Sequence, residues 1–304
     1  MKVVIIGGVA GGATAAARIR RLDEKAEIVV FERSGFISYA NCGLPYYIGG
    51  TIEDEGDLTL QTPESFYKRF RVKMNVRHEV TALHPESKMV TVKNIENGTV
   101  FTETYDKLIL SPGAKPIKPN FEGIDSDKIF TLRTVEDTLK IKKFINEKYP
   151  KSAVVVGGGF IGIEVAENLR ELGIDVTLVE AADQLMAPFD SDMASFIHAE
   201  LRKNGVNLML GRFVEGFADT DDGICVKLKN SPTLHANMVV MAIGVAPETT
   251  LAKDAGLELG IKGSIVVNDR METSVTDIYA VGDAVQIRNF VTDTDALISL
   301  AGPA

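Results

Sequence analysis

The feature that most constrains the fold is a pattern that occurs twice: a short apolar run, a glycine-rich turn and a helix-like segment. The first copy joins apolar residues 3–6 to the turn Gly7-Gly8-Val9-Ala10-Gly11-Gly12. The second joins residues 153–156 to Gly157-Gly158-Gly159-Phe160-Ile161-Gly162, a complete G-x-G-x-x-G. Such runs predict strands buried on both faces, and the glycines let the backbone approach a pyrophosphate at a helix start. Two copies predict two dinucleotide-binding sites in one chain.

An acidic residue closes each copy of the pattern. Glu32 and Glu180 each follow a second apolar run, about 20 residues after the last glycine of their turn. A carboxylate there accepts hydrogen bonds from ribose hydroxyls and repels a 2′-phosphate, so Glu180 predicts that NADH is preferred over NADPH. The alternative for Glu180 is a solvated acid at a strand end. In the first copy Val9 replaces the middle glycine, and an ordinary βαβ unit is the alternative there.

A solitary cysteine, Cys42, lies in the stretch from Ser38 to Gly50. We expect Asn41 to be the N-cap of a helix whose first turn contains Pro45. A thiol at such a helix start faces free backbone N–H groups, which favour the thiolate. Because no Cys-x-x-Cys motif surrounds it, a redox role would require an external disulfide partner or a sulfenic acid. The alternative is a buried structural cysteine.

Size and composition limit the other possibilities. A chain of 304 residues suits two domains, and its net charge of −9 argues against general nucleic-acid binding. Two cysteines cannot build a disulfide framework, and the four histidines show no metal-ligand spacing, so we expect no metal. The apolar N-terminus resembles a signal peptide, but its recurrence near residue 153 indicates structure. We therefore expect a cytoplasmic protein without a membrane span.

The remaining segments predict further strands and turns. Strands are expected at residues 26–31, 89–93, 98–104, 105–110, 176–179, 224–229, 238–243 and 276–281. Residues 115–120 predict a linker between domains, and residues 244–247 a second crossover. Cys225 is expected to be a packing residue of its strand. Asp283 follows a strand and Gly282, where it could accept from a polyol hydroxyl or simply form a turn.

These motifs together resemble those of the FAD-dependent pyridine nucleotide–disulfide oxidoreductases, across essentially the whole chain. The stretch Ser-Tyr-Ala-Asn-Cys-Gly-Leu-Pro-Tyr-Tyr is most similar to the single-cysteine coenzyme A-disulfide reductases and NADH oxidases, including the rhodanese-fused CoA-persulfide reductases. The resemblance implies an α/β fold of two Rossmann-like, three-layer ββα domains, the second inserted in the first. Residues 1–114 and 245–304 would bind FAD, and residues 115–244 NAD(P)H. A C-terminal dimerisation domain, absent from these residues, would make the full-length protein a homodimer.

The resemblance also implies roles for individual residues. Cys42 would be catalytic. The residues expected to bind the two cofactors are Gly7, Val9, Gly11, Gly12, Glu32, Arg33, Ser38, Asn41, Ser111, Pro112, Gly113, Gly157, Gly159, Phe160, Ile161, Gly162, Glu164, Glu180, Gly244, Gly282, Asp283 and Ala301. Those expected to contact CoA are Thr14, Arg18, Arg21, Ser38 and Asn41. The alternatives are an exposed helix residue for Glu164 and a basic helix end for the arginines, Arg20 included.

The implied reaction passes a hydride from NADH through FAD to Cys42. That cysteine would then reduce CoA disulfide, CoA persulfide or polysulfide by thiol–disulfide exchange. Two other functions stay open. One is an NADH oxidase or peroxidase that cycles Cys42 through a sulfenic acid, although Ala10 stands where the peroxidases carry a histidine. The other is a flavin-binding electron-transfer module with an inert cysteine.

Overall fold

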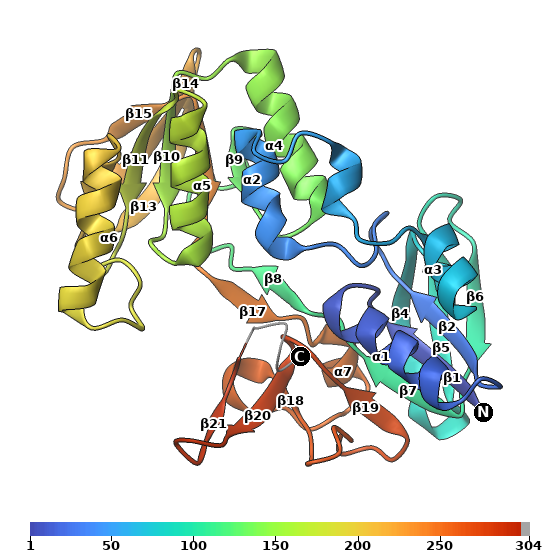
Figure 1. The fold of residues 1–304 in the computed structure, drawn as a ribbon. Helices are drawn as coiled ribbons and strands as arrows, with labels where there is room; N and C mark the ends of the chain where they lie inside the picture. Colours follow the sequence, from blue (N-terminus) through green and yellow to red (C-terminus); the bar gives the residue numbers. More distant parts are fainter. Residues whose placement is uncertain (299–304) are drawn as a thin grey trace. The chain divides into compact units, whose positions relative to one another are not determined.

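The computed structural model describes residues 1–298, which form two compact units (Figure 1). The first unit contains Met1–Tyr39, Thr59–Lys115 and residues 246–298. The second contains Ala40–Leu58 and Pro116–Val245. Each unit is built around a five-stranded parallel sheet.

The sheet of the first unit has the order β19-β7-β1-β2-β3. Its strands are β1 (Lys2–Ile6), β2 (Glu27–Phe31), β3 (Lys73–Asn75), β7 (Lys107–Leu110) and β19 (Ile278–Ala280). The central strand β1 pairs with β2 on one side and with β7 on the other, so Ile6 lies opposite both Phe31 and Leu110. This position explains the apolar run: a central parallel strand is covered on both faces.

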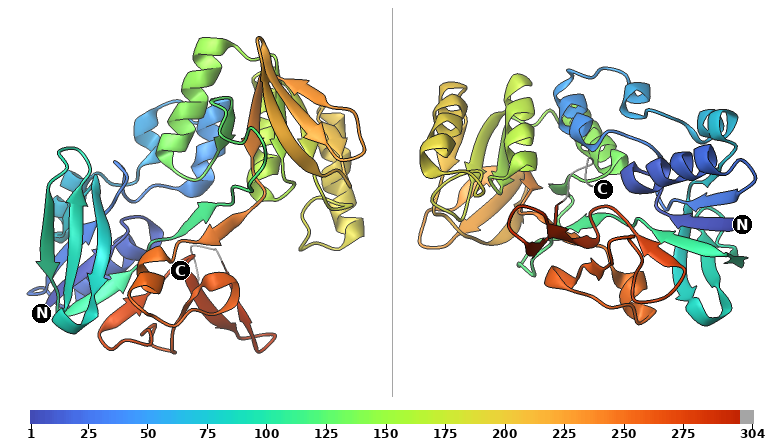
Figure 2. Two further views of the ribbon diagram at one scale, coloured as in Figure 1. Left: turned by 180° about the vertical axis from the view of Figure 1, so that it is seen from behind. Right: turned by 60° about the horizontal axis from the view of Figure 1, so that its bottom comes forward.

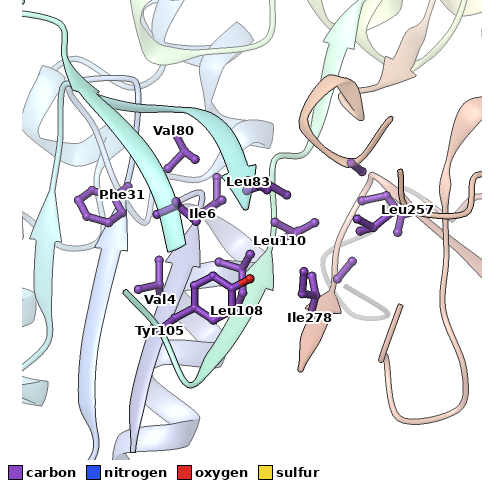
Figure 3. Packing of buried hydrophobic residues seen from close by; sticks show 14 of the residues in the cluster. Val4, Ile6, Phe31, Val80, Leu83, Tyr105, Leu108, Leu110, Leu257 and Ile278 are labelled. Atoms are coloured by element: carbon purple, nitrogen blue, oxygen red, sulfur yellow. The ribbon is translucent and has the colours of Figure 1, made fainter. Parts of the chain in front are cut away.

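Alternate residues of β1 belong to two different layers. Val4 and Ile6 pack in one core cluster with Val80, Leu83 and other residues of an antiparallel sheet (Figure 3). That sheet consists of β4 (His78–His84), β5 (Met89–Asn94) and β6 (Val100–Thr104). Val3 belongs to a second cluster, which includes residues of α1 (Ala10–Leu22) and α3 (Pro63–Phe70). The layers are therefore sheet, sheet and helix, as the sequence predicts.

The second unit repeats this plan. Its parallel sheet has the order β12-β11-β10-β16-β9. The strands are β9 (Ile129–Thr131), β10 (Ser152–Val156), β11 (Asp175–Val179), β12 (Asn207–Met209) and β16 (Met238–Met241). An antiparallel sheet packs on it, formed by β13 (Val214–Thr220), β14 (Gly223–Leu228) and β15 (Leu234–Ala236). The helices are α4 (Val135–Lys148), α5 (Phe160–Glu171) and α6 (Ser191–Lys203).

The segment that carries Cys42 belongs to the second unit, although its sequence lies between two parts of the first. It contains η1 (Asn41–Gly43), α2 (Leu44–Gly49) and η2 (Glu55–Leu58), where η denotes a 3₁₀-helix. Helix α2 lies against α5 and α4, as Figure 2 shows from two sides. Nothing in the local sequence indicates this affiliation, because it depends on contacts with residues far along the chain.

The remaining elements are short. They are η3 (Pro85–Ser87), β8 (Ala114–Pro116), β17 (Val245–Pro247), α7 (Thr250–Asp254), η4 (Ile261–Gly263), β18 (Ile265–Val266), β20 (Val285–Asn289) and β21 (Thr294–Ala296). The predicted linker contains the point between Lys115 and Pro116 where the chain passes from the first unit to the second, and its first residues also form part of β8, which pairs with β17. The pairing continues where the Ile117 N–H donates to the Gly244 carbonyl over 3.0 Å. No helix within residues 1–298 is both long and apolar enough to cross a membrane.

Candidate cofactor and redox site

The glycine turn of the first unit connects β1 to α1. Gly7 has a φ of +100°, and its N–H donates to the Phe31 carbonyl over 2.9 Å. A Cβ on Gly12 would lie 1.9 Å from the Gly7 carbonyl oxygen, so α1 can approach the turn only without a side chain there. Val9 is the N-cap residue of α1 and makes no side-chain hydrogen bond to the helix. Helix α1 therefore begins at a closely packed glycine turn. This is the arrangement that the pyrophosphate of a bound dinucleotide requires.

The turn of the second unit has the same construction. Gly157 has a φ of +109°, and its N–H donates to the Val179 carbonyl over 2.8 Å. A Cβ on Gly162 would lie 1.9 Å from the Gly157 carbonyl oxygen. A Cβ on Gly159, by contrast, would meet nothing within 4 Å. The space beside the middle glycine is open, and it suits a pyrophosphate that approaches the N-terminus of α5.

The two acidic residues are held in the same way. The Glu32 carboxylate accepts hydrogen bonds from the Gly8 and Ser34 N–H groups, each over 2.8 Å. The Glu180 carboxylate accepts from the Gly158 N–H over 2.6 Å and from the Ala182 N–H over 2.7 Å. Each acid is therefore fixed beside its glycine turn rather than simply solvated at a strand end. A carboxylate has acceptor capacity beyond two bonds, so both can also accept from a ribose.

Other predicted cofactor residues of the first unit lie at the carboxyl ends of its strands. The Ser111 N–H donates to the Ile6 carbonyl over 2.7 Å, which places the start of Ser111–Gly113 beside the turn. A Cβ on Gly11 would lie 2.6 Å from the Ser111 Oγ, and one on Gly282 would lie 3.6 Å from it. Gly282 thus brings the Gly282-Asp283 pair to the same edge. The carboxyl edge of a parallel sheet is where open α/β folds bind ligands.

Three further residues are expected at the cofactor site of the first unit: Ser38, Arg33 and Ala301. The Ser38 N–H donates to the Gly8 carbonyl over 3.0 Å, so Ser38 also lies at the glycine turn. Arg33 is exposed immediately after Glu32. Ala301 lies outside the described residues.

Cys42 lies in the 3₁₀ turn η1 and is exposed. A buried structural cysteine is therefore excluded. The prediction that Asn41 caps a helix is wrong: neither η1 nor α2 has a side-chain capping bond, and the Asn41 Oδ1 is buried without a hydrogen-bond partner. The reason is that η1 precedes the α-helix, which begins only at Leu44. Pro45 does lie in the first turn of α2, as predicted.

The packing of α2 on α5 brings acidic groups of α5 near Tyr46 of α2. Burial raises the pKa of Tyr46, and the charges of Glu164, Glu167 and Cys42 raise it further. Burial, followed by the charge of Glu167, also raises the pKa of Glu164. Glu164 is half-buried rather than an exposed helix residue. The helix that begins at the second glycine turn therefore also carries the surface against which the cysteine helix packs.

The other nucleotide residues of the second unit lie near the same helix start or at the end of the sheet. Phe160 and Ile161 form the first turn of α5, and Phe160 is 63% exposed. Gly244 has a φ of +114° and follows β16 by three residues. All of these residues belong to the second unit, together with Cys42.

The expected CoA residues are not brought together within one unit. Thr14, Arg18 and Arg21 are exposed on α1, and with Ser38 they belong to the first unit, whereas Asn41 belongs to the second. Their joint role therefore stays a prediction.

Arg20, also considered for phosphate binding, has a structural role instead. Its guanidinium donates to the Phe70 carbonyl over 2.9 Å and to the Glu24 carbonyl over 2.6 Å. It also donates to the carbonyls of Asp23 and Arg71. Arg20 thus joins the ends of α1 and α3 and uses its donors there.

Three further contacts were not predictable from the motifs. The Lys142 Nζ donates to the Ile48 carbonyl over 2.8 Å, and the Asn168 amide, spaced four residues from Glu164, donates to the Glu164 carbonyl over 2.8 Å. Cys225 is not simply a packing residue, because its Sγ lies 3.2 Å from the Nδ1 of His235 on the next strand. Of these contacts, the sequence indicated only that Asn168 and Glu164 are spaced four residues apart, the distance at which helix residues can interact. Within residues 1–298, no group of three His, Cys, Asp or Glu side chains could hold a metal ion.

The two glycine turns have the same geometry, and each is hydrogen-bonded to a glutamate, Glu32 or Glu180. The chain therefore contains two units of the dinucleotide-binding type. The profile of the family described as pyridine nucleotide-disulphide oxidoreductase matches residues 1–296. The chain belongs to this family. The predicted family, the fold class and the class of enzyme, an oxidoreductase that uses pyridine nucleotides, are thereby confirmed.

Among the proteins to which this chain is similar over nearly its whole length are the following three. A coenzyme A disulfide reductase of Staphylococcus aureus is 39% identical over 300 residues, covering 99% of this chain and 67% of the relative. The structure of reduced CoADR-RHD from Bacillus anthracis is 49% identical with a TM-score of 0.97, covering 99% of this chain and 54% of that one. An NAD-dependent persulfide reductase from A. fulgidus is 36% identical with a TM-score of 0.95, covering 100% and 57%. This chain thus spans between about half and two thirds of these relatives' length.

Proposed function

We propose that the protein is an FAD-dependent NADH:disulfide oxidoreductase whose redox group is Cys42 and whose substrate is CoA disulfide or CoA persulfide. The observation that carries this proposal is the position of Cys42: an exposed thiol on a segment that packs against α5, the helix of the second nucleotide turn. The similarity to coenzyme A disulfide reductases over 99% of the chain supports the substrate class.

The two units divide the cofactors between them. In the first unit, the closely packed Gly7–Gly12 turn and Glu32 fit the ADP half of FAD, and Asp283 is the proposed partner of the ribityl chain. In the second, the open space at Gly159 and the fixed Glu180 fit NADH. The proposed domain boundaries are residues 1–114 and 245–304 for FAD and 115–244 for NAD(P)H, although Ala40–Leu58, within the first of these ranges, packs with the second compact unit.

Bound FAD supplies a two-electron carrier between the nicotinamide and sulfur. The chain's own contribution is the thiol. The Cys42 thiolate attacks one sulfur of CoA disulfide, which forms a Cys42–S–S–CoA mixed disulfide and releases one CoA thiolate. Two electrons that originate in NADH then cleave the mixed disulfide, a proton is taken up, and the second CoA leaves. With CoA persulfide as acceptor, attack on the CoA-bound sulfur would give the same mixed disulfide and release hydrosulfide. With polysulfide, the thiolate would take a terminal sulfur as a Cys42 persulfide and release a shorter polysulfide, and two electrons and a proton would then free the bound sulfur as hydrosulfide.

Glu180 is the proposed determinant of NADH preference. Two backbone N–H groups fix its carboxylate at the end of β11. There it would accept from a ribose 2′-hydroxyl and repel the 2′-phosphate of NADPH. Arg18, Arg21 and Thr14 on the exposed face of α1, with Ser38 and Asn41, are the proposed contacts of CoA.

The assembly and location of the protein follow the same resemblance. We infer that the full-length protein acts as a homodimer in the cytoplasm, a setting consistent with its two free cysteines. Light scattering on the full-length protein would test the dimer.

Steady-state NADH consumption tests the proposed function. We expect the FAD-loaded, full-length protein to consume NADH rapidly with CoA disulfide or persulfide and slowly with peroxide or with oxygen alone. Cys42→Ser should abolish the disulfide-dependent rate, whereas Cys225→Ser should retain it. Turnover that depends on peroxide or oxygen instead would favour the oxidase or peroxidase function. Full activity of Cys42→Ser would favour an electron-transfer module with an inert cysteine.

A further inference from the structure

The start of the segment that carries Cys42 is held by the backbone and by burial: the Ala40 N–H donates to the Leu58 carbonyl over 3.3 Å, and Leu44 and Pro45 are buried. Neither η1 nor α2 is capped by a side chain. Helix α2 is only six residues long, too short to be stable without tertiary contacts. The orientation of the thiol therefore depends on the tertiary contacts at both ends of this segment.

A further set of contacts holds the C-terminal end of α2. Ile48 is fully buried, and its carbonyl accepts a hydrogen bond from the Lys142 Nζ on α4 over 2.8 Å. Gly50 ends the helix with a φ of +91°, and a Cβ there would lie 3.9 Å from the same Nζ. A cation at this end complements the helix dipole and satisfies a carbonyl that the helix itself leaves unpaired.

The neighbours of Lys142 hold its ammonium group at the C-terminal end of α2. Its Nζ lies 5.6 Å from the centre of the Tyr47 ring, a cation–π distance. Lys142 is half-buried, and this burial lowers the pKa of its ammonium group. On the other side of α2, Gly49 packs so closely on Asn168 of α5 that a Cβ there would lie 2.1 Å from the Asn168 Oδ1. Any larger residue would displace the helix from α5.

We propose that Lys142 is a positioning residue for Cys42: it fastens the C-terminal end of α2 to α4 and so holds the cysteine segment on the nucleotide-binding unit. The catalytic meaning of this anchor rests on the proposed function, but the anchor itself does not. Lys142 touches neither the thiol nor a reacting atom. It acts through the placement of α2.

Three variants of the full-length protein test the anchor. Lys142→Met removes the charge and the donor but keeps an apolar stem, and Lys142→Arg keeps both. Lys143→Met is the matched control, because Lys143 is the next residue of α4 and its side chain is 72% exposed. Within residues 1–298, its one described ion pair is with Glu147, one turn away on the same helix. We expect Lys142→Met to raise the hydrogen-exchange rate of the α2 amides roughly tenfold, as loss of one hydrogen bond to a charged group would. Lys142→Arg should restore protection, and Lys143→Met should leave it unchanged.

The same variants separate positioning from general stability. In the FAD-loaded enzyme, Lys142→Met should lower kcat for disulfide reduction while KM for NADH stays the same, because Glu180 and the glycine turn are untouched. If the α2 amides of Lys142→Met exchange at the wild-type rate, the proposal that Lys142 anchors α2 is wrong, whatever the activity of the variant. An equal loss of protection in Lys143→Met would also overturn it. If instead Cys42→Ser remains fully active, the proposed function fails while the exchange result still decides the anchor.

Discussion

Two glycines of the second nucleotide turn, Gly157 and Gly159, are required for different reasons. Gly157 is required by the fold, because its φ is +109° and a Cβ would lie 2.4 Å from the Ala242 carbonyl oxygen. Gly159 has an ordinary φ of −83°, and its Cβ would point into open space. The fold does not explain that glycine, whereas the approach of a pyrophosphate would.

This contrast yields a paired prediction. Gly157→Ala should destabilise the protein by about 1–3 kcal/mol, the usual cost of a strained backbone position. Gly159→Ala should leave the free energy of unfolding unchanged and weaken NADH binding. Urea unfolding and NADH titration would measure the two effects. Equal destabilisation by both substitutions would contradict the reading of Gly159 as a ligand-facing position.

Glu164 gives a prediction on pH dependence. Burial raises the pKa of its carboxyl above the ordinary value of 4.5. The folded protein therefore binds a proton more readily there than the unfolded chain, and the stability from this site is lost as pH rises through the folded-state pKa. Glu164→Gln should then be more stable than the wild type at pH 7, with the difference vanishing below about pH 4.5. Thermal unfolding across this pH range is the measurement; a constant difference at all pH values would contradict it.

At the scale of elements, the helices differ in how they are fastened. Helix α4 begins with a capping box, in which the Thr134 Oγ1 accepts from the Asp137 N–H and the Asp137 carboxylate accepts from the Thr134 N–H. Helix α3 begins with the same device at Thr62 and Ser65. Helix α2, with no such cap, depends on α4 and α5 instead. Of the two helices that support α2, α4 thus has a side-chain cap, whereas Gly159, the N-cap residue of α5, provides none.

Removing the cap of α4 should therefore have a measurable cost. We expect Thr134→Ala to lower the free energy of unfolding by about 1 kcal/mol, because an N-cap threonine satisfies a helix N–H group that alanine cannot. Thr134→Ser, which keeps the hydroxyl, is the control and should restore most of this loss. The midpoint of urea unfolding measures both, and an unchanged midpoint for Thr134→Ala would disprove the role of the cap.

The elements also show what the sequence could and could not predict. The strands β1, β2, β10 and β11 were predictable because a buried strand leaves a continuous apolar run, and the acids at 32 and 180 because they follow such runs. The missing cap at Asn41 and the structural role of Arg20 were not. Both depend on a 3₁₀ turn or on carbonyl groups brought close by folding, which leave no local pattern.

At the scale of the whole molecule, the chain contains one architecture twice. Both parallel sheets have their glycine-turn strand in the centre, and both carry a three-stranded antiparallel sheet. The sequence predicted this duplication through its two glycine motifs. It did not predict that the cysteine segment, placed in sequence within the first copy, packs with the second, because that depends on contacts such as Gly49 with Asn168.

The central claim is that Cys42 exchanges with a CoA disulfide. The most direct measurement is mass spectrometry of the full-length protein after incubation with CoA disulfide, with peptides assigned for Cys42 and Cys225. We expect a disulfide-linked CoA on the Cys42 peptide, none on Cys225, and its loss when NADH is added to the FAD-loaded protein. A Cys42 that stays unmodified under these conditions, or an adduct that NADH does not remove, would contradict it.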